Sequence, residues 1–232
     1  MQPSKPNKFD HDLHARKKGE TDFWGQIRRT VNGKPVDESQ VLMIVDRIRE
    51  KLVLRETDIL LDIACGNGAL ASRVFSSLSG YQGLDFSEYL IKVANKYFAK
   101  LPQFAFAHSG ASEYIDAETE PHRYTKVLCY GSFSYFLPEH AANVLGKLHQ
   151  DFTNVTHVFI GNLPDKKLAE QFYGTGRVNI NELTDNESPI GIWRSRDEFI
   201  KLAQDHGWNA EISIMPRDYY AAYYRYDILL TR

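Results

Sequence analysis

Apolar residues recur every three or four positions in the segment 37–52, which begins with acidic residues. The apolar positions are Val41, Ile44, Val45, Ile48 and Leu52. Because this spacing gathers them on one face of a helix, the segment predicts an amphipathic α-helix that packs on a core.

Farther along the chain, short apolar runs alternate with segments of helical periodicity. The runs that predict strands are 58–63, 80–84, 104–108, 126–129, 156–161, 211–215 and 222–230, and helices are predicted from Ala69 onward and at 89–98, 139–152 and 196–206. Strands that alternate with helices are typical of parallel βαβ units, with helices on both faces of one sheet. The sequence therefore predicts a doubly wound α/β fold.

The C-terminal part departs from this alternation. Its last two strands follow each other through "PRDYY", a connection too short for a crossover helix, so they predict an antiparallel pair at the edge of the sheet. The segment 163–193 is rich in Gly, Asn and Asp. A loop of this length in a compact domain is usually functional.

The first 22 residues are rich in Lys, Pro, His, Asp and Gly and show no periodicity, so they predict a mobile arm. An arm in this position can close over a site. We therefore divide the chain into an N-terminal arm or lid at 1–40 and a core domain at 41–232.

Composition narrows the class of protein. With 232 residues, 43% of them hydrophobic, the chain can bury a sizeable core as one domain. A formal net charge of -2 gives no basic field for nucleic acid or anionic membranes, and no apolar run approaches the roughly 20 residues of a membrane helix. Two cysteines and no recognisable signal segment predict a soluble, cytoplasmic protein without a disulfide scaffold. The oligomeric state stays open.

A glycine turn follows the first core strand in "ILLDIACGNGALASRVF", which spans residues 59–75. Ligands of open α/β sheets bind at such strand-to-helix turns, where Gly66 and Gly68 allow close approach. Asp62 precedes the turn, and Asp85 ends the next strand, about 20 residues on, where an acid meets a ribose diol. The turn thus predicts a nucleoside-containing ligand, although a tight turn without a ligand would show the same Gly-Asn-Gly.

Two ligands suit this arrangement: a nicotinamide dinucleotide and S-adenosylmethionine. A pyrophosphate prefers bare backbone N–H groups, whereas the ammonium and sulfonium of S-adenosylmethionine prefer a nearby carboxylate, so Asp62 favours the second. Gly66, Gly68 and Ala71 still fit the looser G-x-G-x-x-A spacing, so a dinucleotide-dependent oxidoreductase remains an alternative. A third alternative is a cofactor-binding module with no catalysis of its own.

"LLDIACGNGALA" resembles motif I of the class I S-adenosylmethionine-dependent methyltransferases, and "YQGLDFSEYLIKVA" resembles their ribose-binding strand and helix. The resemblance implies a Rossmann-like, mostly parallel seven-stranded sheet that ends in an antiparallel strand pair. The residues that it places around the cofactor are Asp62, Cys65, Gly66 and Gly68 at the methionine part, Asp85 at the ribose and Phe86 beside the adenosine. Ala64 stands where many members have a glycine.

Two further positions depart from the family pattern. Where relatives carry an acid after the third strand, "FAHSGASEY" has Gly110 and Ala111, so adenine would be bound there by backbone and apolar contacts. Thr125 precedes the fourth strand in place of an acid.

Methyl transfer compels no particular catalytic residue, because the cofactor supplies the electrophile. After the fourth strand, "CYGSFSYFLPEH" offers side chains that would face the transferred methyl group: Tyr130, which also lies beside the cofactor, Ser132, Ser134 and Tyr135. His108 and His140 are further candidates. Aromatic packing and surface histidines are the alternative explanations.

The segment "DFWGQIRRTVNGK" combines Phe23 and Trp24 with Arg28 and Arg29, which suits an anionic or ring-bearing substrate through stacking and bidentate contacts. An equal alternative is that Trp24 anchors the arm and that both arginines are solvated. A second wall is expected at "FIGNLPDKK", with Asn162 and Asp165, although these residues also suit a tight turn.

The acceptor is expected to be a small polar molecule. The segments "FWGQIRRTVNGKP" and "YYRYDILLTR" are similar to methyltransferases found among surface-saccharide biosynthesis proteins, which implies a sugar or nucleotide-sugar hydroxyl or amine. No His and carboxylate cluster has metal-ligand spacing, so no metal is expected.

Overall fold

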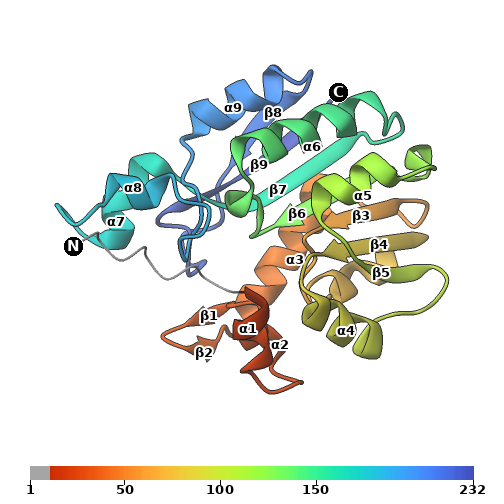
Figure 1. Ribbon diagram of the computed structural model, residues 1–232, viewed down its shortest axis with the longest axis horizontal. Helices are drawn as coiled ribbons and strands as arrows, with labels where there is room; N and C mark the ends of the chain where they lie inside the picture. The colour runs from red at the N-terminus through yellow and green to blue at the C-terminus, as the bar shows by residue number, and fades with distance from the viewer. Residues whose placement is uncertain (1–10) are drawn as a thin grey trace, which may run out of the picture.

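The computed structural model describes residues 11–232, and its centre is a seven-stranded sheet with the order β5-β4-β3-β6-β7-β9-β8 (Figure 1). Its strands are β3 (Ile59–Ile63), β4 (Gly80–Asp85), β5 (Phe104–His108), β6 (Lys126–Tyr130), β7 (His157–Pro164), β8 (Asn209–Ser213) and β9 (Arg225–Thr231). Neighbouring strands from β5 to β7 are parallel, whereas β9 is antiparallel to both β7 and β8. The predicted doubly wound fold and its antiparallel C-terminal pair are confirmed.

Helices cover both faces of this sheet (Figure 1). One face packs against α3 (Glu38–Leu52) and α4 (Glu88–Tyr97), and the other packs against α5 (Ala111–Ala117), α6 (Pro138–Gln150) and α9 (Arg196–Gln204). The five apolar positions predicted to face the core from α3 are all buried. Helical spacing of apolar residues therefore located this helix and its packed face correctly.

Two elements near the glycine turn differ from the prediction. The turn leads into a 3-10 helix, η1 (Ala71–Ser77), where an α-helix was expected, and the Ser72 hydroxyl donates to the Ala69 carbonyl at 2.9 Å. Serines that bond to nearby backbone in this way compete with α-helical hydrogen bonds. Helix α5 was not predicted, because it has seven residues and only one buried apolar side chain, Ile115, so no periodicity marks it.

The N-terminal segment is folded against the core from residue 11 onward. It contains α1 (His11–Arg16), α2 (Phe23–Gln26) and a hairpin of β1 (Thr30–Val31) and β2 (Lys34–Pro35), which lie together at the bottom of Figure 1. The Asp12 carboxylate accepts hydrogen bonds from Ser87 Oγ at 2.6 Å and from Tyr89 N at 3.2 Å, at the start of α4.

The prediction of a mobile arm is therefore wrong for residues 11–22. Long-range polar contacts attach this segment to the core, and such contacts leave no hydrophobic pattern in the sequence. The remainder of the expected arm, residues 1–10, lies outside the described residues.

The predicted long loop begins after β7 and contains three short helices, η4 (Lys166–Leu168), α7 (Ala169–Tyr173) and α8 (Ile180–Leu183). Aromatic rings of Phe172, Tyr173 and Trp193 pack against one another and fix this segment beside β9. The remaining 3-10 helices are η2 (Pro121–Arg123) and η3 (Phe133–Tyr135).

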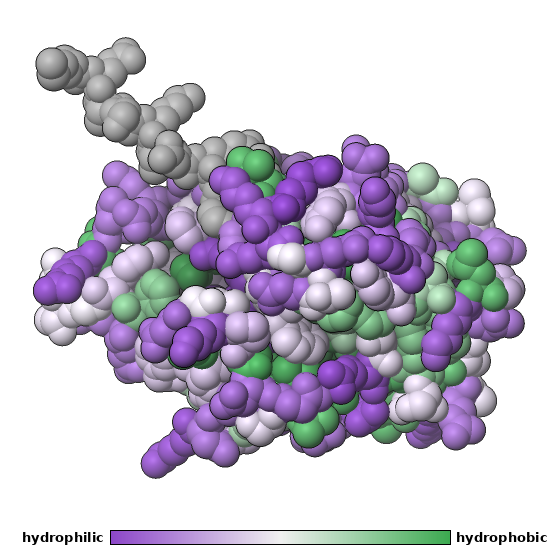
Figure 2. All heavy atoms as spheres, turned by 90° about the horizontal axis from the view of Figure 1, so that it is seen from below, coloured by the Kyte–Doolittle hydropathy of each residue, from purple (hydrophilic) through white to green (hydrophobic). Residues whose placement is uncertain are grey.

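Seen from below, hydrophilic side chains cover most of the surface, with hydrophobic groups set between them (Figure 2). Within residues 11–232, no helix combines the length and the apolar character needed to cross a bilayer.

Candidate functional site

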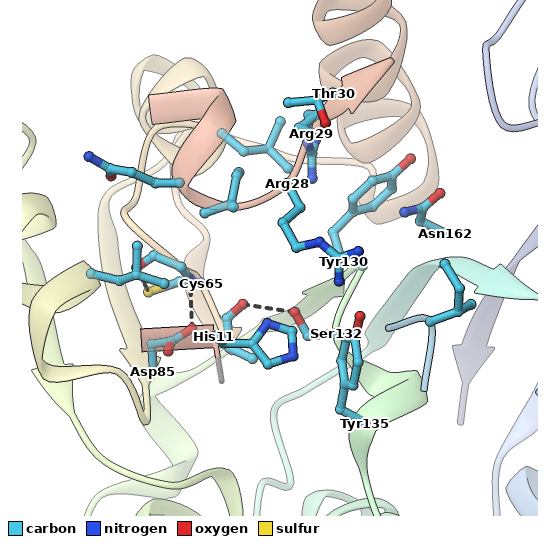
Figure 3. A pocket seen from close by; sticks show the side chains of 18 of the residues that line it. His11, Arg28, Arg29, Thr30, Cys65, Asp85, Tyr130, Ser132, Tyr135 and Asn162 are labelled. Carbon is cyan, nitrogen blue, oxygen red and sulfur yellow. Dashed lines mark hydrogen bonds between the residues drawn. The ribbon is translucent and has the colours of Figure 1, made fainter. Parts of the chain in front are cut away.

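A cavity of about 350 Å³ lies at the carboxyl ends of β3, β4 and β6. Arg28 and Arg29 reach it from the N-terminal segment, Cys65 and Asp85 lie on one side, and Tyr135 lies on the other (Figure 3). This is the edge at which doubly wound sheets bind ligands, so the topology and the cavity indicate the same site.

The glycine turn contributes one glycine to the cavity and one to the core. Gly66 has φ +60° and lies in the cavity wall. Gly68 has φ +77°, and a Cβ there would lie 2.6 Å from Phe106 Cε1, so Gly68 is needed for packing beneath the turn. Ala64, which stands where relatives have glycine, also adopts a positive φ of +58° and lines the cavity. The backbone conformation thus explains a glycine preference at that position.

Asn67, between the two glycines, connects the turn to the N-terminal segment. Its side chain is fully buried, and Nδ2 donates to Phe23 O and to Gln26 Oε1, both at 2.8 Å. Its Oδ1 accepts from Ala69 N at 3.2 Å. Sequence reasoning interpreted Asn67 only as part of a tight turn and missed this contact, because its partners lie more than 40 residues away.

Asp85 is buried at the end of β4 and lines the cavity. One oxygen accepts from Gly66 N and the other from Ser87 N, each at 2.9 Å. Burial raises the pKa of Asp85 to about 6, although these two N–H groups and His108 oppose the rise. Each carboxylate oxygen can accept a second hydrogen bond, so Asp85 retains the capacity to bind a diol.

Asp62 lies at the same end of the cavity, on β3. It accepts a hydrogen bond from the Tyr81 hydroxyl at 2.9 Å. Burial raises the pKa of Asp62 to about 7, with a smaller contribution from Asp85, whereas Arg29 acts in the opposite direction. A cation bound beside Asp62 would favour the ionised carboxylate.

The part of the site around Phe86 is more open. Phe86 is 58% exposed and lies in the cavity wall, and its carbonyl contacts His108 Nε2 at 2.9 Å. His108 is itself exposed and does not line the cavity, nor do Gly110, which precedes α5, and Ala111, which begins it. The structure therefore brings Phe86 to the cavity and leaves the other three residues beside it.

The last residue of β6 and the residues that follow it form the wall opposite Asp85. The buried ring of Tyr130 lines the cavity, Ser132 Oγ donates to Ala64 O at 3.3 Å, and the Tyr135 hydroxyl donates to Pro189 O at 2.8 Å. Burial raises the pKa of both tyrosines, most strongly that of Tyr130. Their hydroxyls therefore stay protonated near neutral pH.

Two candidates from the same stretch do not line the cavity. Ser134 is buried beside it, and its carbonyl accepts from Ile192 N at 2.7 Å. His140 is exposed on α6. Asp165, expected as part of a second wall, instead pairs with Arg196 at 2.8 Å and caps η4.

The two arginines of the N-terminal segment differ in environment. Arg28 donates from Nη1 to Pro189 O at 2.8 Å and lies toward Tyr135. Arg29 is buried, its guanidinium carbon lies 5.3 Å from the Tyr130 ring centroid, and its Nη1 has no hydrogen-bond partner among the described residues. Trp24 does not line the cavity but packs beside Arg29, whose guanidinium carbon lies 5.9 Å from the centroid of the Trp24 ring.

Asn162 lies on β7 at an irregular register with β9 and lines the cavity. It has φ +63°, and its buried Oδ1 has no hydrogen-bond partner among residues 11–232. Its N–H donates to Asp227 Oδ1 at 2.8 Å, and its carbonyl accepts from Arg225. A non-glycine residue with positive φ costs backbone energy and is often found at functional sites.

Arg225, Tyr220 and Tyr224 also line the cavity. Sequence reasoning did not select them individually, although "YYRYDILLTR" belongs to the segment whose family resemblance was noted. Their position beside Asn162 depends on the pairing of β9 with β7. The sequence alone does not predict this pairing.

Residues 61–153 match the family described as a methyltransferase domain. The match includes the glycine turn, Asp85 and β6. It favours S-adenosylmethionine over a nicotinamide dinucleotide as the ligand of the turn. No curated protein matches the chain in sequence.

Several solved structures share the fold. The cyclopropane synthase MmaA2 from Mycobacterium tuberculosis is 16% identical, with a TM-score of 0.65 over 92% of this chain and 79% of that one. Magnesium protoporphyrin IX methyltransferase (ChlM) from Synechocystis PCC 6803, with bound SAM, is 14% identical, with a TM-score of 0.58 over 98% and 100%. The methyltransferase domain of bacterial CtHen1-CN is 16% identical, with a TM-score of 0.60 over 84% and 99%. At sequence identities this low, the structural similarity establishes the shared fold alone.

The family match covers the part of the chain that carries the turn and the two acids. Two carboxylates, Asp62 and Asp85, and a glycine turn that leaves room for a ligand lie together in the cavity wall. Residues 61–153 are therefore a methyltransferase domain within a Rossmann-like sheet, and S-adenosylmethionine is its cofactor.

Proposed function

We propose that this enzyme methylates a hydroxyl or amine of a small polar acceptor, namely a sugar or a nucleotide-sugar. The observation that carries the proposal is the continuity of the cavity, which joins Asp85 at one end to Tyr135 and Asn162 at the other. One end suits the cofactor, and polar groups of the other end suit an acceptor rich in hydroxyls. The resemblance of the terminal segments to surface-saccharide methyltransferases supports a sugar.

In this proposal the residues around the turn bind the cofactor. Asp85 accepts hydrogen bonds from the ribose diol, Phe86 contacts the adenosine, and Gly66 leaves room for the methionine part. Asp62 faces the ammonium group. Arg29 pairs with the carboxylate, because its buried Nη1 otherwise has no partner among the described residues. Bound S-adenosylmethionine supplies a methyl group that is activated by its sulfonium.

The other residues orient the acceptor. Asn162 lines the cavity and its buried Oδ1 has no hydrogen-bond partner among the described residues, so in this proposal its side-chain amide turns to bind the O–H or N–H of the nucleophile. Tyr130 and Tyr135 stay protonated and therefore act as donors or as packing surfaces, not as bases. Alignment of the acceptor with the methyl group is then the main contribution of the protein.

We also propose that residues 1–40 serve as a lid, with 41–232 as the methyltransferase domain. In the described part of this segment, His11 packs edge-on against Tyr135 with ring centroids 4.6 Å apart. Asn67 links α2 to the glycine turn through two hydrogen bonds. A ligand that contacts the turn would therefore also stabilise the segment that covers it.

Transfer of a labelled methyl group from S-adenosylmethionine tests the proposal directly. The acceptors would be sugars, sugar phosphates, nucleotide-sugars and, for comparison, phenols and fatty acids. We expect a labelled product with one or more members of the sugar groups. Thermal stabilisation by S-adenosylhomocysteine, but not by nicotinamide dinucleotides, would accompany it, because only a ligand of the native state raises the midpoint.

Product formed only from the phenols or fatty acids would overturn the sugar acceptor. Cofactor binding without transfer to any acceptor, including those in a cell extract, would favour a binding module instead. An Asn162→Ala variant provides a further check, since it should lower turnover while S-adenosylhomocysteine affinity stays unchanged.

A further inference from the structure

Arg225 is the first residue of β9 and lies in the wall of the cavity. Its Nη1 donates to the main-chain carbonyl of Asn162, and its guanidinium carbon lies 4.7 Å from the ring centroid of Tyr224. One contact is a hydrogen bond to backbone and the other is a cation–π contact. Together they fix a positive charge at the acceptor end of the site, away from Asp62 and Asp85.

This charge has no acidic partner at ion-pair distance within the described part of the chain. Asp227, two residues along β9, interacts with it only at longer range, and the Oδ1 of Asp227 accepts from Asn162 N. The neighbouring Arg196, in contrast, pairs with Asp165 at 2.8 Å. Like Arg29, Arg225 therefore lines the cavity without an ion pair among the described residues.

The groups around Arg225 are tyrosines. Burial opposes its charge, but the hydroxyl groups of Tyr224, Tyr220 and Tyr135 raise its pKa overall, so the guanidinium stays charged. Tyr135, Tyr220 and Tyr224 all line the cavity. A charged group in a partly buried aromatic wall is stabilised when an anion of matching geometry binds it.

Arg28 adds a second positive charge to the same end. It reaches the cavity from the opposite wall, and both its Nη1 and the Tyr135 hydroxyl donate to Pro189 O at 2.8 Å. Two guanidinium groups from segments nearly 200 residues apart therefore lie around one space. Neither Asp62 nor Asp85 belongs to this part of the wall.

We infer that the methyl acceptor is an anion whose carboxylate or phosphate group binds Arg225. The inference rests on the proposed methyltransferase function of the same cavity and adds the charge of its substrate. The planar guanidinium binds carboxylate and phosphate through paired hydrogen bonds, and the tyrosine rings suit the uncharged remainder of the acceptor. An acidic sugar, a sugar phosphate and a nucleotide-sugar all satisfy this chemistry.

Matched ligand pairs test the inference in the complex with S-adenosylhomocysteine. The pairs are glucose with glucose 1-phosphate, glucose with glucuronate, and uridine with uridine diphosphate glucose, and inorganic pyrophosphate is a further probe. Calorimetric titration would be done with wild-type protein, Arg225→Gln, Arg225→Lys and the control Arg177→Gln, which changes an exposed arginine outside the cavity.

We expect at least one anionic ligand to bind wild-type protein about tenfold more tightly than its neutral partner, which corresponds to roughly 1.4 kcal/mol. Arg225→Gln should abolish this difference, Arg225→Lys should retain part of it, and Arg177→Gln should retain all of it. Preference for the phosphate pair or for the glucuronate pair would identify the anion. Unchanged affinity for S-adenosylhomocysteine would show that the variants are folded.

The inference is overturned if the affinities of wild-type protein and Arg225→Gln for every anionic probe are equal. It is also overturned if neutral and charged acceptors are methylated with equal kcat/KM. Another result would separate the anion site from the proposed function. If anions bind in a way that depends on Arg225 but no acceptor is methylated, the methyltransferase reaction in this cavity is overturned and the anion site stands.

Discussion

The two ends of the cavity differ in charge and in how the chain builds them. At the cofactor end, Asp62 and Asp85 lie on adjacent parallel strands, and Cys65 N donates to Leu84 O at 2.9 Å. At the acceptor end, Arg28 and Arg225 come from opposite parts of the sequence. In the proposed function, the cofactor is therefore bound by a short motif, whereas the acceptor is bound by residues that only the tertiary structure brings together.

The difference in charge follows the chemistry of the ligands. The acidic end suits a ribose diol and an ammonium group, and the basic end suits an anion. Arg29 lies between them, above Tyr130 and electrostatically coupled to Asp62. Changes at one end should alter affinity for one ligand and leave affinity for the other, which the following variants measure.

The largest effect on cofactor affinity is expected from Gly66→Val. Gly66 has φ +60°, and a Cβ there would lie 2.9 Å from Ile27 Cγ2. A branched side chain would fill the space for the ligand and strain the turn, so S-adenosylhomocysteine affinity should fall by about a hundredfold or more. Calorimetry with the purified variant measures this loss.

Gly176→Val is the matched control for backbone strain. Gly176 also has a positive φ, +71°, but a Cβ would meet nothing within 4 Å, and the residue lies outside the cavity. This variant should bind the cofactor normally. Normal binding by Gly66→Val as well would mean that the turn does not face the ligand.

Asp85→Ala should have the next largest effect. The carboxylate would lose its hydrogen bonds with the ribose, which for a charged group corresponds to about 1.5 to 3 kcal/mol in binding free energy. Titration with S-adenosylhomocysteine measures the change, and Asp116→Ala, at an exposed acid on α5, is the control. Unchanged affinity of Asp85→Ala would remove Asp85 from the cofactor site.

Much of the fold could be predicted because its signals are local and repeated. The apolar positions of α3 and the alternation of strands with helices needed only hydrophobic spacing. Helix α1 could not be found in this way, because the hydrogen bonds of Asp12 to Ser87 and Tyr89 provide its attachment. A polar contact between distant segments has no periodic signature.

The candidate site was likewise predictable only where its signals are local in the sequence. Asp62, Gly66 and Asp85 follow strands at spacings fixed by the parallel register, and all three line the cavity. Arg225 reaches the cavity because β9 pairs with β7 through an irregular register near Asn162. Such a register depends on packing of the whole sheet, so its consequence for one side chain could not be deduced from the sequence.

Cofactor affinity should also depend on pH at the acidic end. In the free enzyme, burial raises the pKa of Asp62 to about 7, and the ammonium of the cofactor favours the ionised form. Binding therefore lowers this pKa, so affinity rises with pH and levels off above about 7. One pH unit below its pKa only about a tenth of the carboxylate is ionised, so affinity at pH 6 should be about tenfold weaker than at pH 8.

Titrations with S-adenosylhomocysteine across this range measure the dependence. Asp62→Asn provides the control, because the amide keeps an oxygen for the Tyr81 hydroxyl but does not titrate. At pH 8, Asp62→Asn should bind S-adenosylhomocysteine more weakly than wild-type protein. Its affinity should also depend much less on pH. The pKa of Asp85, raised by burial to about 6, would account for the remaining loss at lower pH. A slope that is equal in both proteins would contradict a charged contact at Asp62.

The smallest effect on cofactor affinity is expected from Arg28→Ala, although this change lies only one residue from Arg29. Arg28 faces Tyr135 and Pro189 at the acceptor end, so its removal should lower kcat/KM for the acceptor. Cofactor affinity should stay within about threefold, under roughly 0.7 kcal/mol.

Trp24→Ala and Arg29→Ala are the comparison variants, because Trp24 packs beside Arg29, whose Nη1 is buried without a partner among the described residues. Both should weaken S-adenosylhomocysteine binding more than Arg28→Ala does. Loss of the cofactor in Arg28→Ala, with an unchanged acceptor KM, would assign the whole N-terminal segment to the cofactor pocket.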